Sequence, residues 1–457
     1  MSGVALNDAA MATGAQVLAP QRFPSMLHVV TDTRSIAAGD TFLALRGERF
    51  DGHAFVRDAL KKGAAAIVVD DPDVVPEGVP ALLVADTKRA YMDLAAAARR
   101  NFGGHVVAIT GSAGKTTTKQ LLAQLLGMHF GDAHVLATPA NENNEIGVSK
   151  LLLQATSQHR AIVVEMGARH EGEITELVSI AHPHAGILTN IGEAHLEIFG
   201  SQERLARTKW GLFSNGAQAV LNARDSESRR RAAALPAPPI WFGSGEPSMP
   251  GIWVRDERTL LVTQNERLQP FPIDCRLPGA HNRANLAAAV GGALLLGVPM
   301  EEIVAAIPAL SLPEGRYESI EIRGGARVIY DAYNANASGM IAALDAFAAE
   351  SARRRYAVLG SMAELGSEAP ALHERVGAHA AQTRVDALLV GGDFATSLAA
   401  GAVAAGLPSD RIVTFGSNAD AAAWLRDHAQ AGDAVLLKGS RKYKMEEIVS
   451  ALRSGSA

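Results

Sequence analysis

The sequence is poor in cysteine. Its 457 residues include one, Cys275. A single cysteine excludes an intramolecular disulfide framework and leaves no cysteine cluster to bind zinc or an iron–sulfur centre. Reactive thiols need an electropositive setting, which the neighbouring sequence does not display, so we expect Cys275 to be a small buried residue.

An excess of one charge is also missing. The 43 basic and 48 acidic residues are interspersed and give a net charge of −5. No broad cationic surface is therefore expected, which argues against nucleic acid as the main partner. The amino terminus lacks a basic segment followed by an apolar one, and no apolar run reaches the roughly 20 residues that span a bilayer. We expect a cytoplasmic protein that does not insert into membranes.

The length indicates several domains. At roughly 150 residues per domain, the chain corresponds to about three. Short apolar runs alternate with helical patterns, which is typical of α/β domains with mostly parallel sheets. We predict a small amino-terminal α/β domain over residues 1–100, a central domain over 101–311 and a Rossmann-like carboxyl-terminal domain over 312–457. Residues 240–276 are predicted to form an antiparallel edge of the central sheet.

The segment TGSAGKTTT has the composition of a phosphate-binding loop. Gly111 and Gly114 let successive backbone N–H groups turn toward one anion, and the helix predicted near Lys115 points its positive end there. Lys115 supplies charge for the β- and γ-phosphates of ATP, and Thr116 offers a hydroxyl to magnesium. Ile109 stands where the usual motif G-x-x-x-x-G-K-[ST] has its first glycine. The alternative is a turn that caps an ordinary helix, but the strand before and the helix after favour ATP.

Other polar residues are expected beside this loop. Glu165 ends one predicted strand and His195 follows another, so both are placed at the carboxyl edge of the sheet, where such sheets bind ligands. There they could hold a second magnesium ion or orient the phosphorylated group, although each alone is more often a plain strand-end residue. Lys209 lies on a predicted helix, where a solvated lysine is the simpler interpretation. The asparagine-rich segment 138–147 is more simply a turn cluster.

Two strand-end segments stand out in the third domain. DAYNANASG, residues 331–339, and LKGSRKYKME, residues 437–446, carry donors suited to a carboxylate or a phosphate. For the second segment, charge alone favours a solvated face. No G-x-G-x-x-G follows the first strand of this domain, so a nicotinamide cofactor is not supported.

Taken in order, these segments resemble the Mur ligase family over nearly the whole chain. The shortened phosphate loop is the version that the family uses, which accounts for Ile109. The segments VVEMG, EAHLEIFGS, TKWGLF, GAHNRAN, EGRYE and DAYNANASG also match. The resemblance implies an ATP-dependent ligase of peptidoglycan synthesis that forms an amide bond through an acyl phosphate and uses two Mg²⁺ ions.

The resemblance also implies roles for individual residues. The implied catalytic residues are Lys115, Glu165, His195 and Lys209; Thr116, Glu165 and His195 bind magnesium, and Lys209 is carbamylated by carbon dioxide to an N6-carboxylated lysine that supports the second ion. The implied ATP contacts are Gly111, Ser112, Ala113, Gly114, Lys115, Thr116, Thr117, Asn282, Asn285, Arg316 and Asp331. The implied contacts of the other substrates are Thr33, Arg34, Gly47, Asp51, Gly52 and His53 for a uridine nucleotide, together with Asn141, Asn143, Asn144, Tyr333, Asn334 and Asn336.

Within the family, the paired asparagines and the DAYNAN loop favour an enzyme that joins UDP-N-acetylmuramoyl-tripeptide to D-alanyl-D-alanine. We expect it to be a monomer. Two residues depart from the family pattern. Ala337 stands where a proline usually follows DAYNAN, and Ser361 replaces an acidic residue. The alternatives are a ligase that adds the third peptide residue, a folylpolyglutamate-type ligase and, from another class, a nucleotide-switch or transport ATPase.

Overall fold

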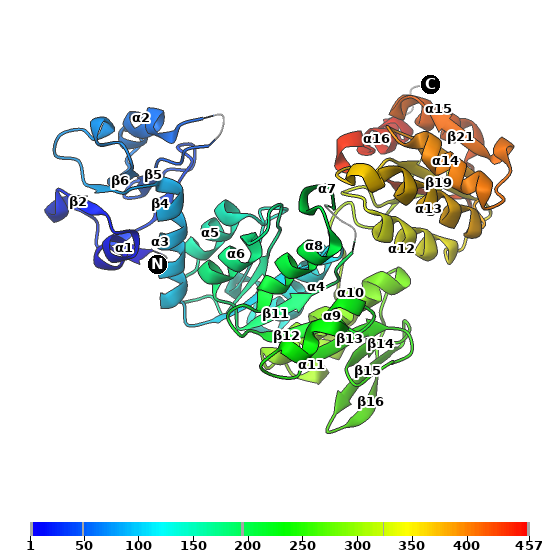
Figure 1. Ribbon diagram of the computed structural model, residues 1–457, viewed down its shortest axis with the longest axis horizontal. Helices are drawn as coiled ribbons and strands as arrows, with labels where there is room; N and C mark the ends of the chain where they lie inside the picture. The colour runs from blue at the N-terminus through cyan, green and yellow to red at the C-terminus, as the bar shows by residue number, and fades with distance from the viewer. Residues whose placement is uncertain (1–2, 48–49, 193–195, 323, 455–457) are drawn as a thin grey trace.

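The protein folds into three α/β units in chain order (Figure 1). The structure, a computed structural model, describes residues 3–47, 50–192, 196–322 and 324–454. Its main sheets have five, nine and six strands within these ranges, which confirms the predicted fold class. The boundaries at 100/101 and 311/312 remain our proposal. No helix in the described ranges is long and apolar enough to cross a membrane.

The first unit is a small sheet with the strand order β2-β7-β6-β5-β4, parallel except for β2. Its central strand β6 is buried along its length, as expected for a parallel strand covered on both faces. The elements are β1 (Val4–Ala5), α1 (Leu6–Thr13), β2 (Gln16–Leu18), β3 (Met26–Leu27), β4 (Val29–Val30), β5 (Thr41–Leu43), α2 (Val56–Lys61), β6 (Ala66–Val69), β7 (Ala81–Leu83) and α3 (Thr87–Asn101).

The second unit is a sheet with the strand order β16-β15-β14-β13-β12-β11-β8-β10-β9. Its strands are β8 (His105–Thr110), β9 (Val135–Ala137), β10 (Ala161–Glu165), β11 (Ala185–Leu188), β12 (Gln218–Asn222), β13 (Ile240–Ser244), β14 (Ile252–Val254), β15 (Thr259–Gln264) and β16 (Arg267–Pro272). Its helices are α4 (Lys115–Phe130), α5 (Glu145–Leu153), α6 (Glu173–Ala181), α7 (Leu196–Phe199), α8 (Gln202–Trp210), α9 (Ser226–Arg231), α10 (Gly279–Leu295) and α11 (Met300–Ala306).

The strand order of this sheet positions the functional site. β8 lies between β10 and β11, because the chain passes to β9 and back through β10 on one side before it moves to β11 on the other. All three strands are parallel, so their carboxyl ends meet at one edge, the switch point where open α/β sheets bind ligands.

The antiparallel edge predicted over residues 240–276 is wrong for its first half. β13 pairs in parallel with both β12 and β14, and the chain reaches β13 from β12 by a crossover that contains α9. Only β15 and β16 add antiparallel pairing, in the part of the sheet that follows β14.

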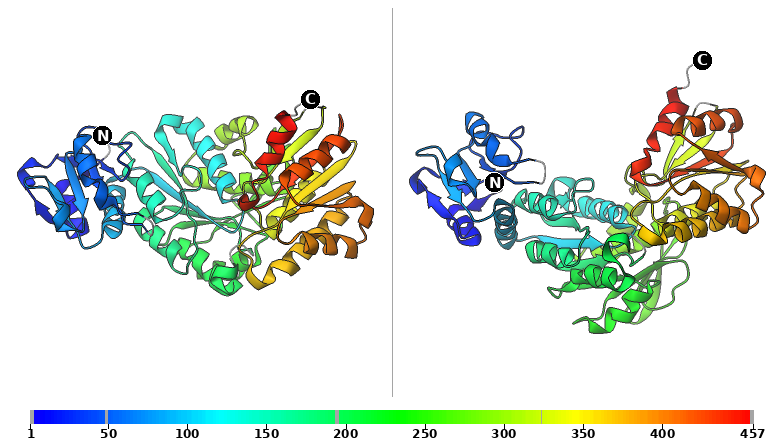
Figure 2. Two further views of the ribbon diagram at one scale, coloured as in Figure 1. Left: turned by 90° about the horizontal axis from the view of Figure 1, so that it is seen from above. Right: turned by 45° about the horizontal axis from the view of Figure 1, so that its top comes forward.

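The third unit is a sheet with the strand order β17-β18-β22-β19-β20-β21, parallel except for β17. Helices cover both faces of this sheet (Figure 2), with α12, α13 and α14 over one buried cluster and α15 and α16 over the other. Its elements are β17 (Glu318–Glu321), β18 (Arg327–Tyr330), α12 (Ala337–Ala348), β19 (Arg355–Gly360), α13 (Ala369–Gln382), β20 (Ala387–Gly391), α14 (Ala395–Ala404), β21 (Ile412–Phe415), α15 (Asn418–His428), β22 (Ala434–Lys438) and α16 (Glu446–Ser454).

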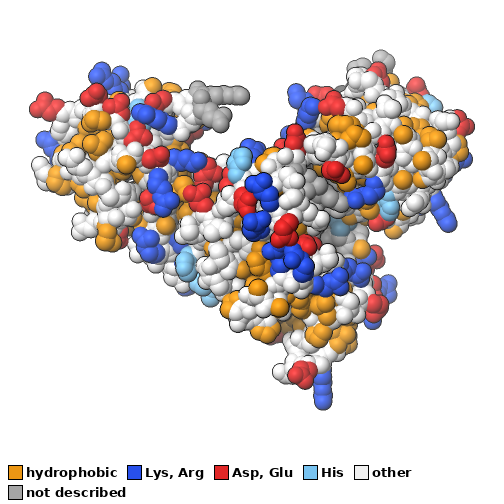
Figure 3. Space-filling view, in the orientation of Figure 1, with side chains coloured by type: hydrophobic (Ala, Val, Ile, Leu, Met, Phe, Trp, Pro, Cys, Tyr) orange, Lys and Arg blue, Asp and Glu red, His pale blue; other side chains and the backbone are white. Residues whose placement is uncertain are grey.

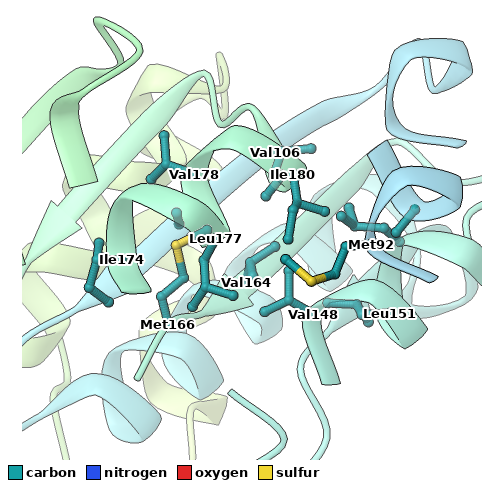
Figure 4. Packing of buried hydrophobic residues seen from close by; sticks show 14 of the residues in the cluster. Met92, Val106, Val148, Leu151, Val164, Met166, Ile174, Leu177, Val178 and Ile180 are labelled. Carbon is teal, nitrogen blue, oxygen red and sulfur yellow. The ribbon is translucent and has the colours of Figure 1, made fainter. Parts of the chain in front are cut away.

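Helix α3 joins the first unit to the second through a continuous apolar core. One face of α3 packs on the first sheet, and Met92 of the same helix lies close to Val148 and Leu151 of α5 (Figure 4). The buried cluster continues from Leu43 and Leu82 of the first unit into the second. A shared apolar core resists relative motion, so these two units are expected to move together.

Arg99 fastens the end of α3 to the second unit. Its side chain is buried, with 7% of the residue exposed. Nε donates to the carbonyl oxygen of Ala181 at 2.7 Å, and Nη2 donates to that of His182 at 3.0 Å. Nη1 donates to the carbonyl oxygen of Phe102 at 3.2 Å. Three backbone acceptors therefore depend on one guanidinium group.

Replacing Arg99 by leucine should lower the free energy of unfolding by about 3 kcal/mol, because buried carbonyl groups would lose their donor. Urea denaturation of Arg99→Leu measures this loss. Arg100→Leu is the matched control, because Arg100 is the next residue and is exposed; its effect should stay within about 0.5 kcal/mol. Equal losses in the two variants would contradict the role given to Arg99.

Candidate active site

The segment TGSAGKTTT forms the predicted connection between β8 and α4. Gly111 has φ 150° and Gly114 has φ 83°, backbone conformations that favour glycine. A Cβ atom at Gly111 would collide with the hydroxyl of Thr189, and one at Gly114 would collide with the side-chain oxygen of Asn285. The loop therefore lies tightly against the end of β11 and the start of α10, and α4 directs its positive end into it.

Two residues after β11 hold this loop, and neither was among the predicted site residues. Thr189 Oγ1 donates to the carbonyl oxygen of Ala113 at 2.6 Å. Asn190 Oδ1 accepts hydrogen bonds from the backbone N–H groups of Ser112 and Ala113, at 3.1 and 2.9 Å. The sequence shows only that these two polar residues follow an apolar strand. That pattern places them at the edge of the sheet, but it does not predict that they bind the phosphate loop.

Two lysine side chains from different helices converge on one backbone oxygen. Nζ of Lys115, in the first turn of α4, donates to the carbonyl oxygen of Gly111 at 2.7 Å, and Nζ of Lys209, near the end of α8, donates to the same oxygen at 3.1 Å. Burial, with repulsion from Lys115, lowers the pKa of Lys209 well below its ordinary value. Burial also lowers the pKa of Lys115, against the opposing attraction of Glu165.

Lys209 is therefore not a solvated lysine, and that interpretation of its helix is wrong. Only 2% of the residue is exposed. The helix α8 packs Leu205 and Ala206 inward as well, so its last turn directs Lys209 toward the phosphate loop. A predicted helix does not reveal which of its faces will be covered, and a long side chain can extend from a partly exposed helix into the interior.

Glu165 ends β10 beside the phosphate loop, as predicted, and is 2% exposed. Its backbone N–H donates to Thr138 Oγ1 at 2.8 Å, and its Oε1 accepts from Asn143 Nδ2 at 2.9 Å. Its Oε2 is buried and has no hydrogen-bond partner among the described residues, but it lies 3.4 Å from Nζ of Lys119. The asparagine-rich segment thus takes part in the site through Asn143.

The other predicted residues of this segment and of the first turn of α4 have separate positions. Asn141 is exposed, and Asn144 caps α5 by accepting a hydrogen bond from the N–H of Gly147 at 3.0 Å. Thr116 is partly buried one residue after Lys115, and Thr117 is buried. Asn144 thus has a structural role that its residue type could have predicted.

The described residues beside the phosphate loop supply some of the oxygen ligands that a divalent cation needs. Glu165 offers a buried carboxylate oxygen without a hydrogen bond, and a hydroxyl-bearing residue, Thr116, follows Lys115. His195, the other predicted ligand, lies outside the described residues. Within the described ranges, no three His, Cys, Asp or Glu side chains cluster as a metal site. Further negative charge near Glu165 would have to come from substrate phosphates or from chemical modification of a neighbouring residue.

The two predicted asparagines of α10 lie against the phosphate loop. Asn285 Oδ1 is 3.4 Å from Oγ1 of Thr118 and faces Gly114. Asn285 Nδ2 donates to Asn282 Oδ1 at 3.4 Å, and Asn282 Nδ2 donates to the carbonyl oxygen of Pro278 at 2.9 Å. Both residues are buried. Two amide groups are thereby held against the phosphate loop.

The third unit reaches the phosphate loop through Asn336. Its Oδ1 caps α12 by accepting the N–H of Gly339 at 2.8 Å, and its Nδ2 donates to the carbonyl oxygen of Ser112 at 3.3 Å. Asn334, two residues earlier, is exposed. Asn336 therefore caps a helix of the third unit and also donates a hydrogen bond to the phosphate loop of the second unit.

Arg316, Tyr333 and Asp331 form a second group near this contact. The guanidinium carbon of Arg316 lies 4.6 Å from the ring centre of Tyr333, a cation–π arrangement. Asp331 is buried and accepts a hydrogen bond from Nζ of Lys438 at 2.6 Å. Lys438 belongs to the segment LKGSRKYKME, so that segment contributes a buried cation as well as exposed ones.

Both departures from the family pattern have a local explanation. Ala337 is the first residue of α12, a position where proline is also well tolerated, so alanine changes little there. Ser361 is fully buried; its Oγ donates to the carbonyl oxygen of Gly391 at 3.0 Å and accepts from the N–H of Phe394 at 2.9 Å. A carboxylate cannot make both bonds.

The predicted uridine-nucleotide residues lie in the first unit, across a broad hollow from the third unit (Figure 3). His53 is buried between two aspartates; its Nδ1 lies 2.6 Å from Asp51 Oδ1, and its Nε2 accepts the N–H of Asp70 at 3.2 Å. A Cβ atom at Gly52 would lie 2.6 Å from the carbonyl oxygen of Leu45, so this turn requires glycine.

The remaining predicted residues of this unit are more open to solvent. Arg34 is exposed and forms a two-point ion pair with Asp32, with Nη2 2.6 Å from Oδ2. The hydrogen bonds from Arg34 lower the pKa of Asp32 to about 2. Gly47 is exposed, and Thr33 is partly exposed. An exposed guanidinium group and a constrained glycine turn suit an anionic ligand, but the described contacts do not join them to the phosphate loop.

Comparison with known proteins identifies the family. The chain matches the Mur ligase family catalytic domain over residues 27–100, the Mur ligase middle domain over 109–293 and the Mur ligase glutamate ligase domain over 315–441. It is 37% identical to the UDP-N-acetylmuramoyl-tripeptide–D-alanyl-D-alanine ligase of Synechocystis sp., over 93% of this chain and 91% of that protein.

Two solved structures extend the comparison to the fold. MurF from Acinetobacter baumannii has a TM-score of 0.86 and 29% identity, covering 99% of both chains. MurF from Thermotoga maritima in complex with ADP has a TM-score of 0.79 and 28% identity, covering 93% of this chain and 96% of that one. With its three matched domains and this full-length similarity, the chain belongs to the Mur ligase family.

Proposed function

We propose that this protein joins UDP-N-acetylmuramoyl-tripeptide to D-alanyl-D-alanine at the expense of ATP, giving the pentapeptide precursor of peptidoglycan. The observation that carries the proposal is the convergence of Lys115 and Lys209 on the Gly111 oxygen, beside Glu165. The Synechocystis relative is named for this ligation and matches nearly the whole chain.

In the proposed reaction, the terminal carboxylate of the tripeptide attacks the γ-phosphate of ATP and releases ADP. The product is an acyl phosphate. The amine of D-alanyl-D-alanine then attacks the acyl carbon, and the tetrahedral intermediate expels phosphate to leave an amide. Lys115 offsets the charge that would otherwise repel the carboxylate from the phosphate, which is the main demand of phosphoryl transfer.

The chain's other residues orient the substrates. The N–H groups of Ser112 and Ala113, now bonded to Asn190, and the start of α4 suit the ATP phosphates. Asn282 and Asn285 are proposed at the adenine, Asp331 at the ribose and Arg316 near the nucleotide. The carboxylate and amine ends of the peptides are proposed to meet between Asn143 and the Tyr333–Asn336 segment. The hollow between the first and third units suits substrates that enter before the units close.

Magnesium is the proposed metal cofactor. Thr116, Glu165, His195 and a carboxylated Lys209 would hold two ions. When bound, Mg²⁺ neutralises phosphate charge and polarises the transferred group. The buried Oε2 of Glu165, without a hydrogen bond among the described residues, supports this assignment.

Carboxylation of Lys209 is proposed from its electrostatic setting. Two ammonium groups that share one acceptor oxygen repel each other, and reaction of the neutral Lys209 amine with carbon dioxide would turn this repulsion into attraction. Only the neutral amine reacts. Because burial lowers the pKa of Lys209, the neutral form extends to lower pH than for a solvated lysine, and protonation on further acidification should remove the carbamate.

A substrate-omission assay tests the ligation. Phosphate release should require ATP, UDP-N-acetylmuramoyl-tripeptide and D-alanyl-D-alanine together, because phosphate leaves only after the amine attacks the acyl phosphate. Without the dipeptide, ADP formation should stop at about one equivalent per enzyme. Steady phosphate release without D-alanyl-D-alanine would indicate a nucleotide-switch ATPase. Turnover with a single amino acid in place of the dipeptide would indicate a third-residue or folylpolyglutamate-type ligase.

Replacing Lys209 by alanine should reduce kcat by about 100-fold or more, a loss typical of a lost electrostatic group at the reacting centre. Short carboxylic acids should restore part of the rate. Arg207→Ala is the matched control on α8, because Arg207 is exposed and pairs with Glu171; it should keep the wild-type rate.

Carbon-13 NMR of the protein in ¹³C-bicarbonate tests the carbamate directly. A carbamate signal is expected in the wild type, with loss of that signal as the pH falls, and no signal in Lys209→Arg. A wild-type spectrum without the signal at any pH, or full activity of Lys209→Ala, would remove the carbamate from the mechanism without affecting the proposed ligation.

A further inference from the structure

Lys119 is a buried lysine to which the proposed reaction gives no role. It lies one turn after Lys115 on α4, and 4% of the residue is exposed. Its Nζ donates to the carbonyl oxygens of Thr138 and Ala140, at 2.7 and 3.0 Å, and lies 3.4 Å from Glu165 Oε2. An ammonium group has three protons; two of them serve the carbonyl oxygens, and the contact with Glu165 is an ion pair without a hydrogen bond.

These contacts belong to a closed network around Glu165. Thr138 connects to both charged residues, because its carbonyl oxygen accepts from Lys119 and its hydroxyl oxygen accepts the N–H of Glu165. Asn143, a few residues further on, donates to Glu165 Oε1. Lys119 thus ties together the carboxylate and the loop that carries the amide partner of that carboxylate.

The backbone conformation of Ala140 also indicates that Lys119 stabilises this loop. Ala140 has φ 41°, a left-handed conformation that is unfavourable for a residue other than glycine. Such conformations persist where surrounding contacts hold them. The hydrogen bond from Lys119 to the Ala140 carbonyl is such a contact, and the turn that it stabilises leads directly to Asn143.

The charge of Lys119 compensates that of the Glu165 carboxylate. Burying a charged carboxylate is costly unless a cation compensates it, and Lys119 forms an ion pair with Glu165, which is 2% exposed. This ion pair involves Oε2, the oxygen without a hydrogen bond. A divalent cation that binds this oxygen would take over the compensation of its charge.

We infer that Lys119 is a positioning residue for the metal site. Until a divalent cation binds, its ammonium group compensates the negative charge of Glu165 and its hydrogen bonds order the 138–144 loop. The inference rests on the proposed magnesium role of Glu165. It predicts that Lys119 stabilises the metal-free protein and opposes cation binding, whereas a purely structural lysine would stabilise both forms equally.

Thermal unfolding and calorimetric titration with Mg²⁺, without nucleotide or peptide, test this inference. Lys119→Met should have a lower Tm than the wild type without Mg²⁺, a larger increase in Tm on addition of Mg²⁺, and Mg²⁺ affinity increased by about threefold or more, because a like charge beside the site is removed. Lys119→Arg should retain the wild-type response to Mg²⁺. Lys150→Met is the matched control, because Lys150 pairs with Glu142 of the same loop but is exposed.

A double-mutant cycle with Glu165→Gln supplies the second measurement. Without Mg²⁺, Lys119→Met should cost less stability in the Glu165→Gln background, because no buried carboxylate remains to be compensated. If Lys119→Met does not fold, Lys119→Gln provides the same comparison with a neutral hydrogen-bonding side chain. An unchanged response to Mg²⁺ in the neutral variant, or additive losses in the cycle, would overturn the inference. The wild-type omission assay is independent of these measurements, so a failure here leaves the proposed ligation standing.

Discussion

The carbonyl oxygen of Gly111 accepts hydrogen bonds from two lysines, and the arrangement of the site depends on this convergence. It requires β8 to end between β10 and β11, α4 to begin immediately after the loop, and α8 to direct its last turn inward. It also concentrates positive charge in a buried place with few anions. Such a place suits the phosphates of a nucleotide, which would take over donors that now bond to Asn190 and to Gly111.

The second unit is joined to the first and to the third, and the two junctions differ physically. The first unit shares an apolar core with the second through α3, and Arg99 adds three buried hydrogen bonds. The third unit reaches the loop through Asn336 and contacts α7 near Gly366, where a Cβ atom would lie 3.2 Å from Glu197. Polar contacts can be replaced by contacts with water at lower cost than a packed apolar core can be exposed. The third unit is therefore the one expected to move when substrates bind.

The parts of this arrangement that the sequence predicts are those with a local signature. The phosphate loop was predictable because its glycines, its lysine and the flanking elements are contiguous, and Glu165 because it ends an apolar strand. Lys209 and Lys119 were not, because burial of a lysine on a helix depends on what packs against that helix. Thr189 and Asn190 carried a weaker signal of the same kind as Glu165. The pairing direction of β13 depends on the path of the crossover, which composition does not reveal.

The family resemblance supplied what local chemistry could not, namely a role for Lys209, and the structure makes that role physically reasonable. A glutamate at this position could not extend as far, because its carboxyl group lies closer to the backbone than the end of a lysine. The proposed N6-carboxyl group of Lys209 would carry negative charge to the depth that this side chain reaches beneath the loop. It also forms only while the amine is neutral, a state that burial and the neighbouring Lys115 favour. Lys115, the cation that helps to lower the pKa of Lys209, would then stabilise the negative carbamate. The same neighbour would thus favour both the neutral amine that reacts and the charged product.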